Sequence, residues 1–416
     1  MEPMVTSGRM HRRVSVVGMG VVSPFGTSLQ TYRDALLQGH TGIAPIRDFD
    51  TKGCRSTLAA SVTGFDAPAW ISPMKLRRMD RTGAYAVAAS GLAMEDARQA
   101  RSDDGVDDSG VMLGTWTAGG QATQDYLSAL FRTGPSGAPA LLFNSTVANA
   151  AASLIGLEFK LRGPNATVSY KEASGLAAIV SATEMIREGH ASALAAGGVD
   201  AVYEIFFKAY DRFHVMSPAA MPDARVAPFD ESRGGFVLGE GAFMLWLEQD
   251  DGWQSRGATA YGEILGVGAS SAAVSLNAWP DASGALVRTM RLALDDAGIE
   301  PRDVNVVYAS ANATLALDRV EAEALDALFG SESCVVTSVK GSLGESGASG
   351  SAACIAALLC GKAGRVPPIA GIAKADAAAR TLRLAVAAAP APGPIALVNS
   401  FASGGALFSV VLRVSA

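Results

Sequence analysis

Two segments of the chain resemble each other, and this internal repeat constrains the fold more than any other feature. Residues 174–190, SGLAAIVSATEMIREGH, align without a gap to residues 349–365, SGSAACIAALLCGKAGR, at a lag of 175. Each begins with Ser-Gly, runs through apolar and alanine residues, and ends with a glycine flanked by basic residues. A repeat of this kind predicts two equivalent halves, each built around one such helix.

Strands and helices alternate along the chain, which predicts a layered α/β fold. The strand candidates are short, apolar and rich in β-branched residues, whereas the segments between them have helical spacing. The strand candidates are residues 13–22, 110–116, 193–202, 236–248, 261–270, 304–311 and 396–414. The helix candidates are residues 28–38, 285–299 and 319–330.

The length of 416 residues exceeds what one hydrophobic core usually supports, so two halves are also expected on size. The segment EQDDGWQSRG, near residues 250–258, is polar and separates two strong strand signals. We therefore expect an N-terminal tail over 1–12, an N-terminal half over 13–256 and a C-terminal half over 257–416.

Composition excludes several classes of function. With 49% hydrophobic and 18% charged residues the chain is typical of a well-packed globular protein. A net charge of −6 gives no reason to expect nucleic acid as a partner. No apolar run reaches the roughly 18 residues of a membrane span, and the N-terminus lacks the apolar core of a signal peptide. A cytoplasmic protein without a membrane partner is expected.

Cysteine and histidine show no metal-binding pattern. The four cysteines include no CxxC pair, and Cys354 and Cys360 lie in the alanine-rich repeat, where packed and unreactive thiols are expected. The four histidines do not cluster with each other or with carboxylates at ligand spacing. We expect neither a metal site nor a cofactor.

Several segments resemble the motifs of β-ketoacyl synthases, in the order of that family and over nearly the whole chain from GMGVVSPFG onward. The glycine-rich FDESRGGFVLGEGA is the most specific of these motifs. The segments are residues 161–179, 227–248, 308–325, 338–352 and 399–407. The resemblance implies a thiolase-like α/β fold, with two related halves in five α-β-α-β-α layers, and an obligate dimer.

The family's catalytic residues are missing from the matching positions. Glu172 stands where the resemblance places the nucleophilic cysteine, at a helix N-terminus that favours negative charge. A carboxylate is stabilised at such a helix end, but it cannot form the thioester that condensation requires. Ser310 and Glu345 stand at the two histidines that polarise the malonyl thioester carbonyl, and Ser403 replaces the gating phenylalanine. The chain resembles a synthase that no longer condenses.

Two residues of the family's site remain, Lys340 and Glu321, which the family often pairs as a structural ion pair. The resemblance places them in one interior pocket with Glu172 and Glu345. Three buried carboxylates cannot all be ionised beside one lysine, because an unpaired buried charge is costly. We expect Glu172 to accept backbone amides at its helix end. At least one other carboxylate should be neutralised by a proton or by a further partner.

The pattern is typical of a chain length factor, the non-condensing subunit of a type II polyketide synthase. Such a subunit forms a heterodimer with an active ketosynthase and closes that partner's acyl tunnel. An acyl carrier protein that delivers the chain is the other expected partner. Three alternatives stay open: a malonyl-decarboxylating priming subunit, an enzyme that uses Ser169 or Ser174, and a structural scaffold.

Chain length would be set on the helix after Gly119-Gly120 and at one later position. The resemblance maps the tunnel positions to Gln121, Ala122, Gln124, Ser128 and Leu142. Bulky aromatic residues at such points are typical of subunits for aromatic products. Small and polar residues here favour a more open tunnel and a reduced, polyene-type product. An amphipathic interface helix is the simpler interpretation of the same segment.

A basic segment could contact the acidic carrier protein. SPMKLRRMDR (72–81) contains Lys75, Arg77, Arg78 and Arg81, which could form a docking face. A solvated helix face is the alternative, since carrier docking is expected mainly on the active subunit.

Overall fold

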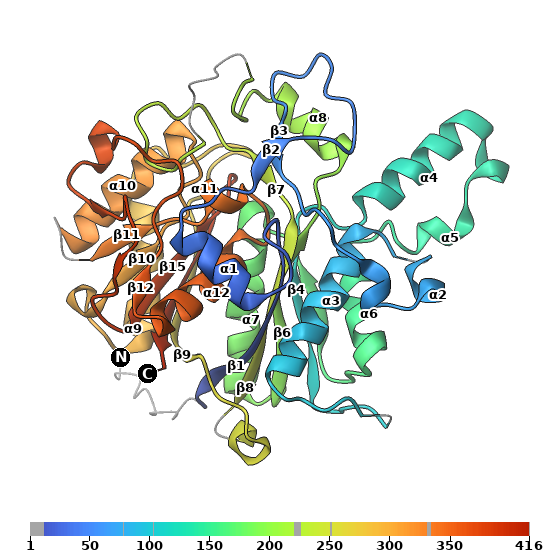
Figure 1. Cartoon of the computed structure of the whole chain (residues 1–416), viewed down its shortest axis with the longest axis horizontal. Helices are drawn as coiled ribbons and strands as arrows, with labels where there is room; N and C mark the ends of the chain where they lie inside the picture. The colour runs from blue at the N-terminus through green and yellow to red at the C-terminus, as the bar shows by residue number, and fades with distance from the viewer. Residues whose placement is uncertain are drawn as a thin grey trace, which may run out of the picture.

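The molecule is built from five layers, with helices on both outer faces and between two halves of a sheet (Figure 1). The computed structural model describes residues 12–77, 79–102, 104–219, 226–249, 252–330 and 334–415. This arrangement confirms the expected thiolase-like fold. Residues 1–11 of the expected tail lie outside the described part of the chain.

Eleven of the described strands form one large sheet, in the order β13-β11-β10-β15-β16-β9-β1-β8-β6-β4-β5. Its two halves are joined where β1 pairs antiparallel with β9 over only three residue pairs, so two layers share one continuous ladder. The bounds are β1 (Val14–Val22), β4 (Ser109–Gly114), β5 (Asn165–Val168), β6 (Ala193–Asp200), β8 (Gly241–Gln249), β9 (Gly262–Ser271), β10 (Val306–Tyr308), β11 (Val335–Thr337), β13 (Arg383–Leu384), β15 (Ile395–Phe401) and β16 (Ala406–Val414).

The internal repeat corresponds to the two helices of the central layer. Helix α7 (Ser174–Glu188) and helix α12 (Ser349–Lys362) begin 175 residues apart and contact each other between the sheet halves. Their shared Ser-Gly start has a packing reason. A Cβ on Gly175 would lie 2.9 Å from the Gly347 carbonyl oxygen, and one on Gly350 would lie 2.7 Å from the Leu176 Cβ. The predicted equivalence of the two halves is confirmed by this pair.

Outer helices cover the two sheet halves. Helix α3 (Arg81–Asp96) and helix α6 (Ala150–Phe159) pack on the strands of the N-terminal half, while α9 (Gly284–Ala297) and α10 (Leu315–Phe329) enclose a core with those of the C-terminal half. The other elements are α1 (Leu29–Leu37), α2 (Pro73–Leu76), α8 (Glu204–Arg212), α11 (Lys340–Leu343), β2 (Ile43–Pro45), β3 (Leu58–Ala60), β7 (Leu238–Gly239), β12 (Arg365–Val366) and β14 (Ala389–Pro390). Every strand and helix candidate of the sequence overlaps an element of the matching type.

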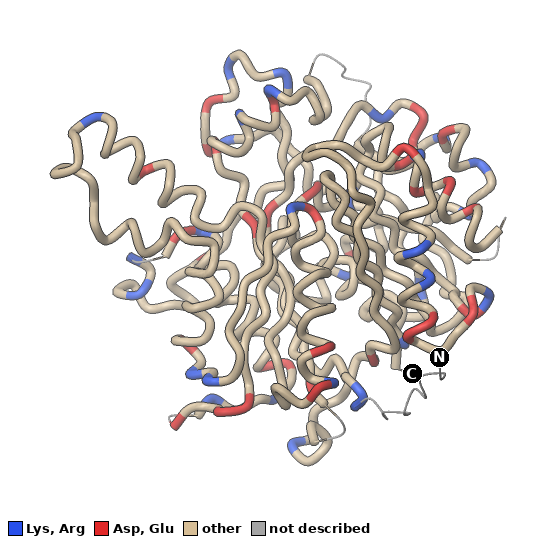
Figure 2. Tube along the Cα trace, turned by 180° about the vertical axis from the view of Figure 1, so that it is seen from behind, with Lys and Arg blue, Asp and Glu red and all other residues tan. Residues whose placement is uncertain are grey.

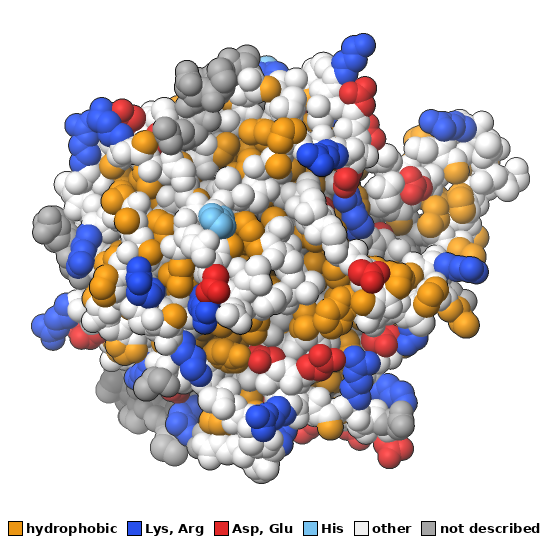
Figure 3. Space-filling model, in the orientation of Figure 1, with side chains coloured by type: hydrophobic (Ala, Val, Ile, Leu, Met, Phe, Trp, Pro, Cys, Tyr) orange, Lys and Arg blue, Asp and Glu red, His pale blue; other side chains and the backbone are white. Residues whose placement is uncertain are grey.

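One arm, with α4 and α5, projects from the body of the molecule (Figures 1 and 2). It consists of α4 (Gly120–Thr133), α5 (Ala140–Phe143) and their connections, and we call residues 119–149 the arm. Asp125 and Arg132 are its only charged residues, and apolar side chains lie open on its surface (Figure 3).

The boundary between the halves lies between β8, which ends at Gln249, and β9, which begins at Gly262. We keep the division at residue 257 as a proposal. No helix in the described part of the chain is long and apolar enough to cross a membrane.

Candidate functional site

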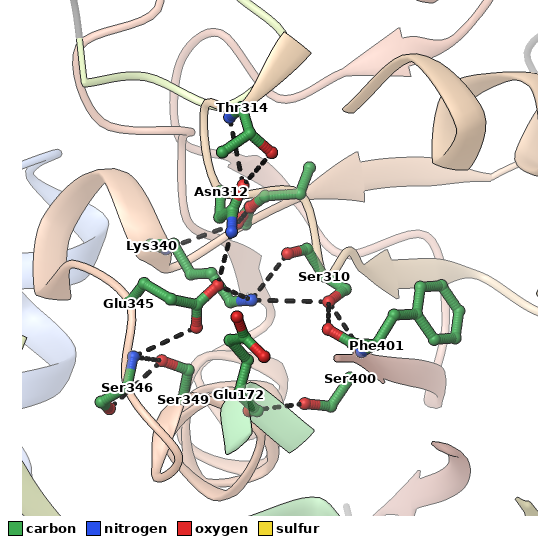
Figure 4. Close-up of polar contacts among 12 residues, drawn as sticks. Glu172, Ser310, Asn312, Thr314, Lys340, Glu345, Ser346, Ser349, Ser400 and Phe401 are labelled. Carbon is green, nitrogen blue, oxygen red and sulfur yellow. Dashed lines mark hydrogen bonds and ion pairs between the residues drawn. The ribbon is translucent and has the colours of Figure 1, made fainter. Parts of the chain in front are cut away.

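Glu172 lies at the centre of the molecule, on the single 3-10 turn Lys171–Ala173 that leads into α7. Its side chain points toward Lys340 and Glu345 (Figure 4), and only 2% of the residue is exposed. The short strand β5 delivers the chain to this turn, and the close packing of α7 against α12 fixes where the turn lies. The structure therefore places the residue at the nucleophile position in the interior.

The C-terminal turn holds the Glu172 carboxylate. Ser403, between β15 and β16, donates its backbone N–H to Oε2 at 3.1 Å and its hydroxyl to Oε1 at 2.9 Å. The expected donors were amides of the helix end, and the Glu172 backbone N–H is one donor whose hydrogen bond lowers the pKa of this carboxyl. Ser403 adds the two contacts from the C-terminal turn. Burial, and next the neighbouring Glu345, raise the pKa of Glu172 to about 7.

Lys340 forms its ion pair with Glu345, not with Glu321 as the resemblance implied. The Nζ of Lys340 lies 2.8 Å from Oε2 of Glu345 and donates to the Ser310 carbonyl oxygen at 2.6 Å. Asn312 donates its side-chain amide to the same Glu345 oxygen at 2.8 Å. The two ion-pair partners are five residues apart on and just after α11, and this local pairing takes the only lysine of the cluster.

Glu321 on α10 lies beside this pair without an ionic partner at contact distance among the described residues. Its Oε1 accepts the Ser310 backbone N–H at 2.9 Å and the Asn399 side-chain amide at 3.1 Å. Its Oε2 has no hydrogen-bond partner in the same described part of the chain. Burial raises the pKa of Glu321 to about 7. The carboxyl with one unpartnered oxygen and a raised pKa fits the expected protonated member of the cluster.

Ser310 joins the strand ends that surround the cluster. Its Oγ accepts the backbone N–H of Phe401 at 2.9 Å, so the hydroxyl is engaged with the neighbouring strand β15. The residue is fully buried. A serine held in this way can brace the backbone, but it offers no imidazole to a substrate carbonyl.

The cluster thus contains three carboxyl groups, one ammonium group and neutral hydrogen-bond donors. It brings together Glu172, Ser310, Glu321, Lys340, Glu345 and Ser403, all of which the sequence singled out. At the positions that the resemblance assigned to the nucleophile and the two histidines, the cluster carries the side chains of Glu172, Ser310 and Glu345. Their hydrogen bonds and the ion pair brace the centre of the fold.

Three residues of the site were missed by sequence reasoning. Asn312 and Asn399 satisfy the buried carboxylates, and Lys171 donates to the Ser403 hydroxyl at 3.3 Å. Asn312 lies two positions after Ser310, and Asn399 opens the C-terminal turn motif, so their motif positions were the available signal. The charged pair Lys171-Glu172 at a helix start was the signal for Lys171.

The expected tunnel positions lie on the arm. Ala122 is buried against this chain, whereas Gln121 donates to Asp125 on the same helix at 2.9 Å. Ser128 and Leu142 are both half-buried. The Oε1 atom of Gln124 is buried and has no hydrogen-bond partner among the described residues. Of these residues, Gln124 is the one whose buried polar end is left without a partner in the described single chain.

The described residues of the basic segment make different contacts. Arg81 contacts Asp48 at 2.5 Å and donates to the Val202 carbonyl oxygen at 2.7 Å, so it ties the fold together. Lys75 forms a 2.6 Å ion pair with Glu158 and Arg77 is exposed. Arg78 lies outside the described residues.

Fold and site together define a ketosynthase-type protein, and comparisons with known sequences agree. The sequence profile of the β-ketoacyl synthase N-terminal domain matches residues 11–251, and that of the C-terminal domain matches residues 261–373. The chain is 30% identical over 400 residues to a 3-oxoacyl-[acyl-carrier-protein] synthase 2 of Synechocystis sp., covering 95% of this chain and 96% of the relative. The chain belongs to the β-ketoacyl synthase family.

Solved structures share the fold. The ishigamide ketosynthase/chain length factor superposes with a TM-score of 0.91 at 30% identity, over 98% of this chain and all of the other. A ketosynthase in complex with its type II polyketide synthase acyl-carrier protein, bound to a hexaketide, superposes with a TM-score of 0.88 over 98% of this chain and all of the other. The latter is 24% identical and supports the fold alone.

Proposed function

We propose that this chain is a non-condensing chain length factor, which pairs with an active ketosynthase and shapes its acyl tunnel. The observation that carries the proposal is the buried Glu172, hydrogen-bonded to Ser403 at the position of the nucleophile. Ser310 and Glu345 at the imidazole positions remove the groups that would polarise a thioester. The likeness to a ketosynthase/chain length factor structure supports the same function.

The alternative functions have weaker support from the site. A priming decarboxylase needs donors to a developing enolate, and the Glu345 carboxylate would repel that charge. Ser174 is buried and donates to the Lys171 carbonyl oxygen at 2.7 Å, which gives it a local structural role. A scaffold without a tunnel gives no function to the polar residues of the arm, such as Gln124 and Ser128. The tunnel function does, because the tunnel positions map to the arm.

The arm supports pairing with a second subunit of the same fold. Phe131 and Leu141 are 82% and 84% exposed, and Phe143 is 57% exposed, all on the arm. Exposed apolar groups of this size, with few charges among them, are typical of a protein contact surface. Strand β5 is a second region with unpaired backbone groups, because it is an edge strand of the eleven-stranded sheet. Obligate pairs commonly bury more than about 2,000 Å² in total, so the arm would be one part of such an interface.

Co-expression tests this function. We expect the chain to co-purify with a candidate ketosynthase that carries an intact cysteine and two histidines. The pair should extend malonyl units on an acyl carrier protein, whereas this chain alone should neither extend them nor carry a covalent acyl group. Acylation of this chain in isolation, or full-length products from the ketosynthase without it, would contradict the proposal.

Charge placed on the arm should break the pair. For Phe131→Asp with Leu141→Asp we expect at least about a 30-fold loss of affinity for the ketosynthase subunit, because central apolar contacts typically contribute about 2 kcal/mol or more each. The affinity can be measured by titration or by analytical ultracentrifugation of the pair. Leu315→Asp, at an exposed apolar residue on α10, is the matched control and should leave affinity unchanged.

Bulk at Ser128 should shorten the product. For Ser128→Phe we expect the paired complex to release chains shorter by one or more two-carbon units, because the ring narrows the space along α4. Ala122 is the poorer choice, since its burial within this chain means that Ala122→Trp would disturb the subunit itself. Thr133→Phe, exposed at the end of the same helix, is the control. Unchanged product lengths from an intact Ser128→Phe complex would contradict the tunnel mapping.

Carrier docking and product class follow as parts of the same proposal. A carrier protein would deliver the chain to the active subunit, and Lys75 and Arg77 are the basic residues of the segment that could assist it. The lack of aromatic residues at the tunnel positions supports a reduced, polyene-type product over an aromatic one.

A further inference from the structure

A continuous line of polar contacts leads from the surface to the buried Glu172 carboxylate. The Asn277 side-chain oxygen accepts a hydrogen bond from Lys171 Nζ, and the same Nζ donates to the Ser403 hydroxyl at 3.3 Å. That hydroxyl donates to Oε1 of Glu172 at 2.9 Å. Burial increases along this line, because Asn277 is exposed, Lys171 is half-buried, and Ser403 and Glu172 are buried.

The backbone at both outer members of this line has an unusual conformation. Lys171 has φ of +48° and Asn277 has φ of +64°. This left-handed region is tolerated by asparagine but is uncommon for lysine. Residues held there at a functional position are maintained by the surrounding contacts. Here those contacts include the line itself and the bond from Gly404 N–H to the Ala278 carbonyl oxygen at 2.9 Å, which holds the loop of Asn277 over the Ser403 turn.

We propose that Lys171 is a positioning residue that closes the access route to this chain's own site. Its ammonium group joins the Asn277 loop to the Ser403 turn, and Ser403 in turn holds the Glu172 carboxyl group in the interior. The site is therefore both filled from within and closed from outside. If the chain acts as proposed above, a carrier-bound thioester reaches only the partner's nucleophile.

Thiol alkylation at position 172 measures this closure. Glu172→Cys in a Cys54→Ser background introduces a thiol at the site, and Cys354 and Cys360 remain as fully buried internal references. Burial raises the pKa of both reference thiols, so they should stay unmodified in the folded chain. Reaction with iodoacetamide is followed by mass spectrometry on the full-length chain, with any subunit it needs for solubility.

Removal of the Lys171 side chain should open the route. We expect the thiol introduced at position 172 to react at least tenfold faster after Lys171→Gly, a substitution that suits the positive φ and should not strain the backbone. Lys171→Arg keeps the cation and should stay slow. Lys160→Gly is the matched control, because Lys160 also has a positive φ, +52°, but lies at the end of α6, away from the site.

Two results would overturn the closure. One is a fast reaction of the introduced thiol while Lys171 is present. The other is a reaction that stays slow after Lys171→Gly in a chain whose Cys354 remains protected. The alkylation rate needs no carrier or condensing activity, so its outcome is separate from the co-expression test of chain-length control.

Discussion

Replacement of Lys340 by methionine is expected to destabilise the folded chain by about 3 to 5 kcal/mol, the range for removing one member of a buried ion pair. Lys340 is the cation paired with Glu345, and the substitution leaves Glu345 buried with only the Asn312 amide and a backbone N–H as donors among the described residues. Methionine keeps much of the volume, so the loss reports on charge rather than on packing. Urea unfolding of the variant and the parent measures it.

Two further variants separate the charge effect from a general intolerance of the core. Lys340→Met combined with Glu345→Gln should recover most of the lost stability, because no unpaired charge then remains. Lys52→Met, at an exposed lysine, should change stability by no more than about 0.5 kcal/mol. A double variant no more stable than Lys340→Met alone would show that the ion pair is not the cause.

Stability should fall as the pH rises from about 5 to above 7, because Glu172 and Glu321 keep their protons to a higher pH in the folded chain than in the unfolded one. The pKa of each is raised to about 7, with burial as the largest cause, against about 4.3 for an unfolded glutamate. The folded state then binds more protons than the unfolded state between these values, so stability is fully present below the unfolded pKa and is lost as the pH passes the folded one. Each carboxyl should contribute a loss of about 2 to 3 kcal/mol.

The free energy of unfolding at about pH 5.5, 7.0 and 8.5, values that lie below, at and above the folded pKa, provides the measurement. Glu172→Gln should reduce the fall in stability with pH by the contribution of one carboxyl group. The amide does not titrate in this range, and its oxygen can still accept a hydrogen bond from Ser403. Glu323→Gln is the matched control, because Glu323 lies on α10 near Glu321 but is paired with Arg319 at the surface. A parent whose stability stays level or rises over this range would contradict the protonated state of the two carboxyls.

Much of the fold could be predicted because it depends on local patterns. The lag between Ser174 and Ser349 identified α7 and α12 as equivalent, and their Ser-Gly starts proved to be the point where the two helices meet. Short apolar runs identified the strands, since buried parallel strands leave that signature. The pairing of β1 with β9, which joins the two sheet layers into one ladder, is a contact over three residue pairs and leaves no mark in the sequence.

The membership of the site could also be predicted, because motif spacing places each residue on the framework. Its internal contacts could not. The sequence offered Glu321 and Glu345 as possible partners for Lys340. Which of them forms the ion pair depends on the distances between the charged groups, and only the folded chain defines those distances. Arg81 belonged to a basic run, yet its side chain contacts Asp48 and a backbone carbonyl oxygen.

The exposure of the apolar side chains on the arm could not be predicted from the sequence either. The segment QDYLSALF has the spacing of an amphipathic helix, whose apolar side chains are usually buried. Only the folded chain shows that Phe131 of this helix is exposed.

The sequence by itself determined the β-ketoacyl synthase framework and the functional groups that Glu172, Ser310 and Glu345 bring to the site, since residue identity alone settles which bonds a side chain can form. The tertiary structure decided which charges meet, which carboxyls keep a proton and which apolar face stays uncovered. These properties depend on distance and on exclusion of water, and both are set by segments as far apart in the chain as Glu172 and Ser403.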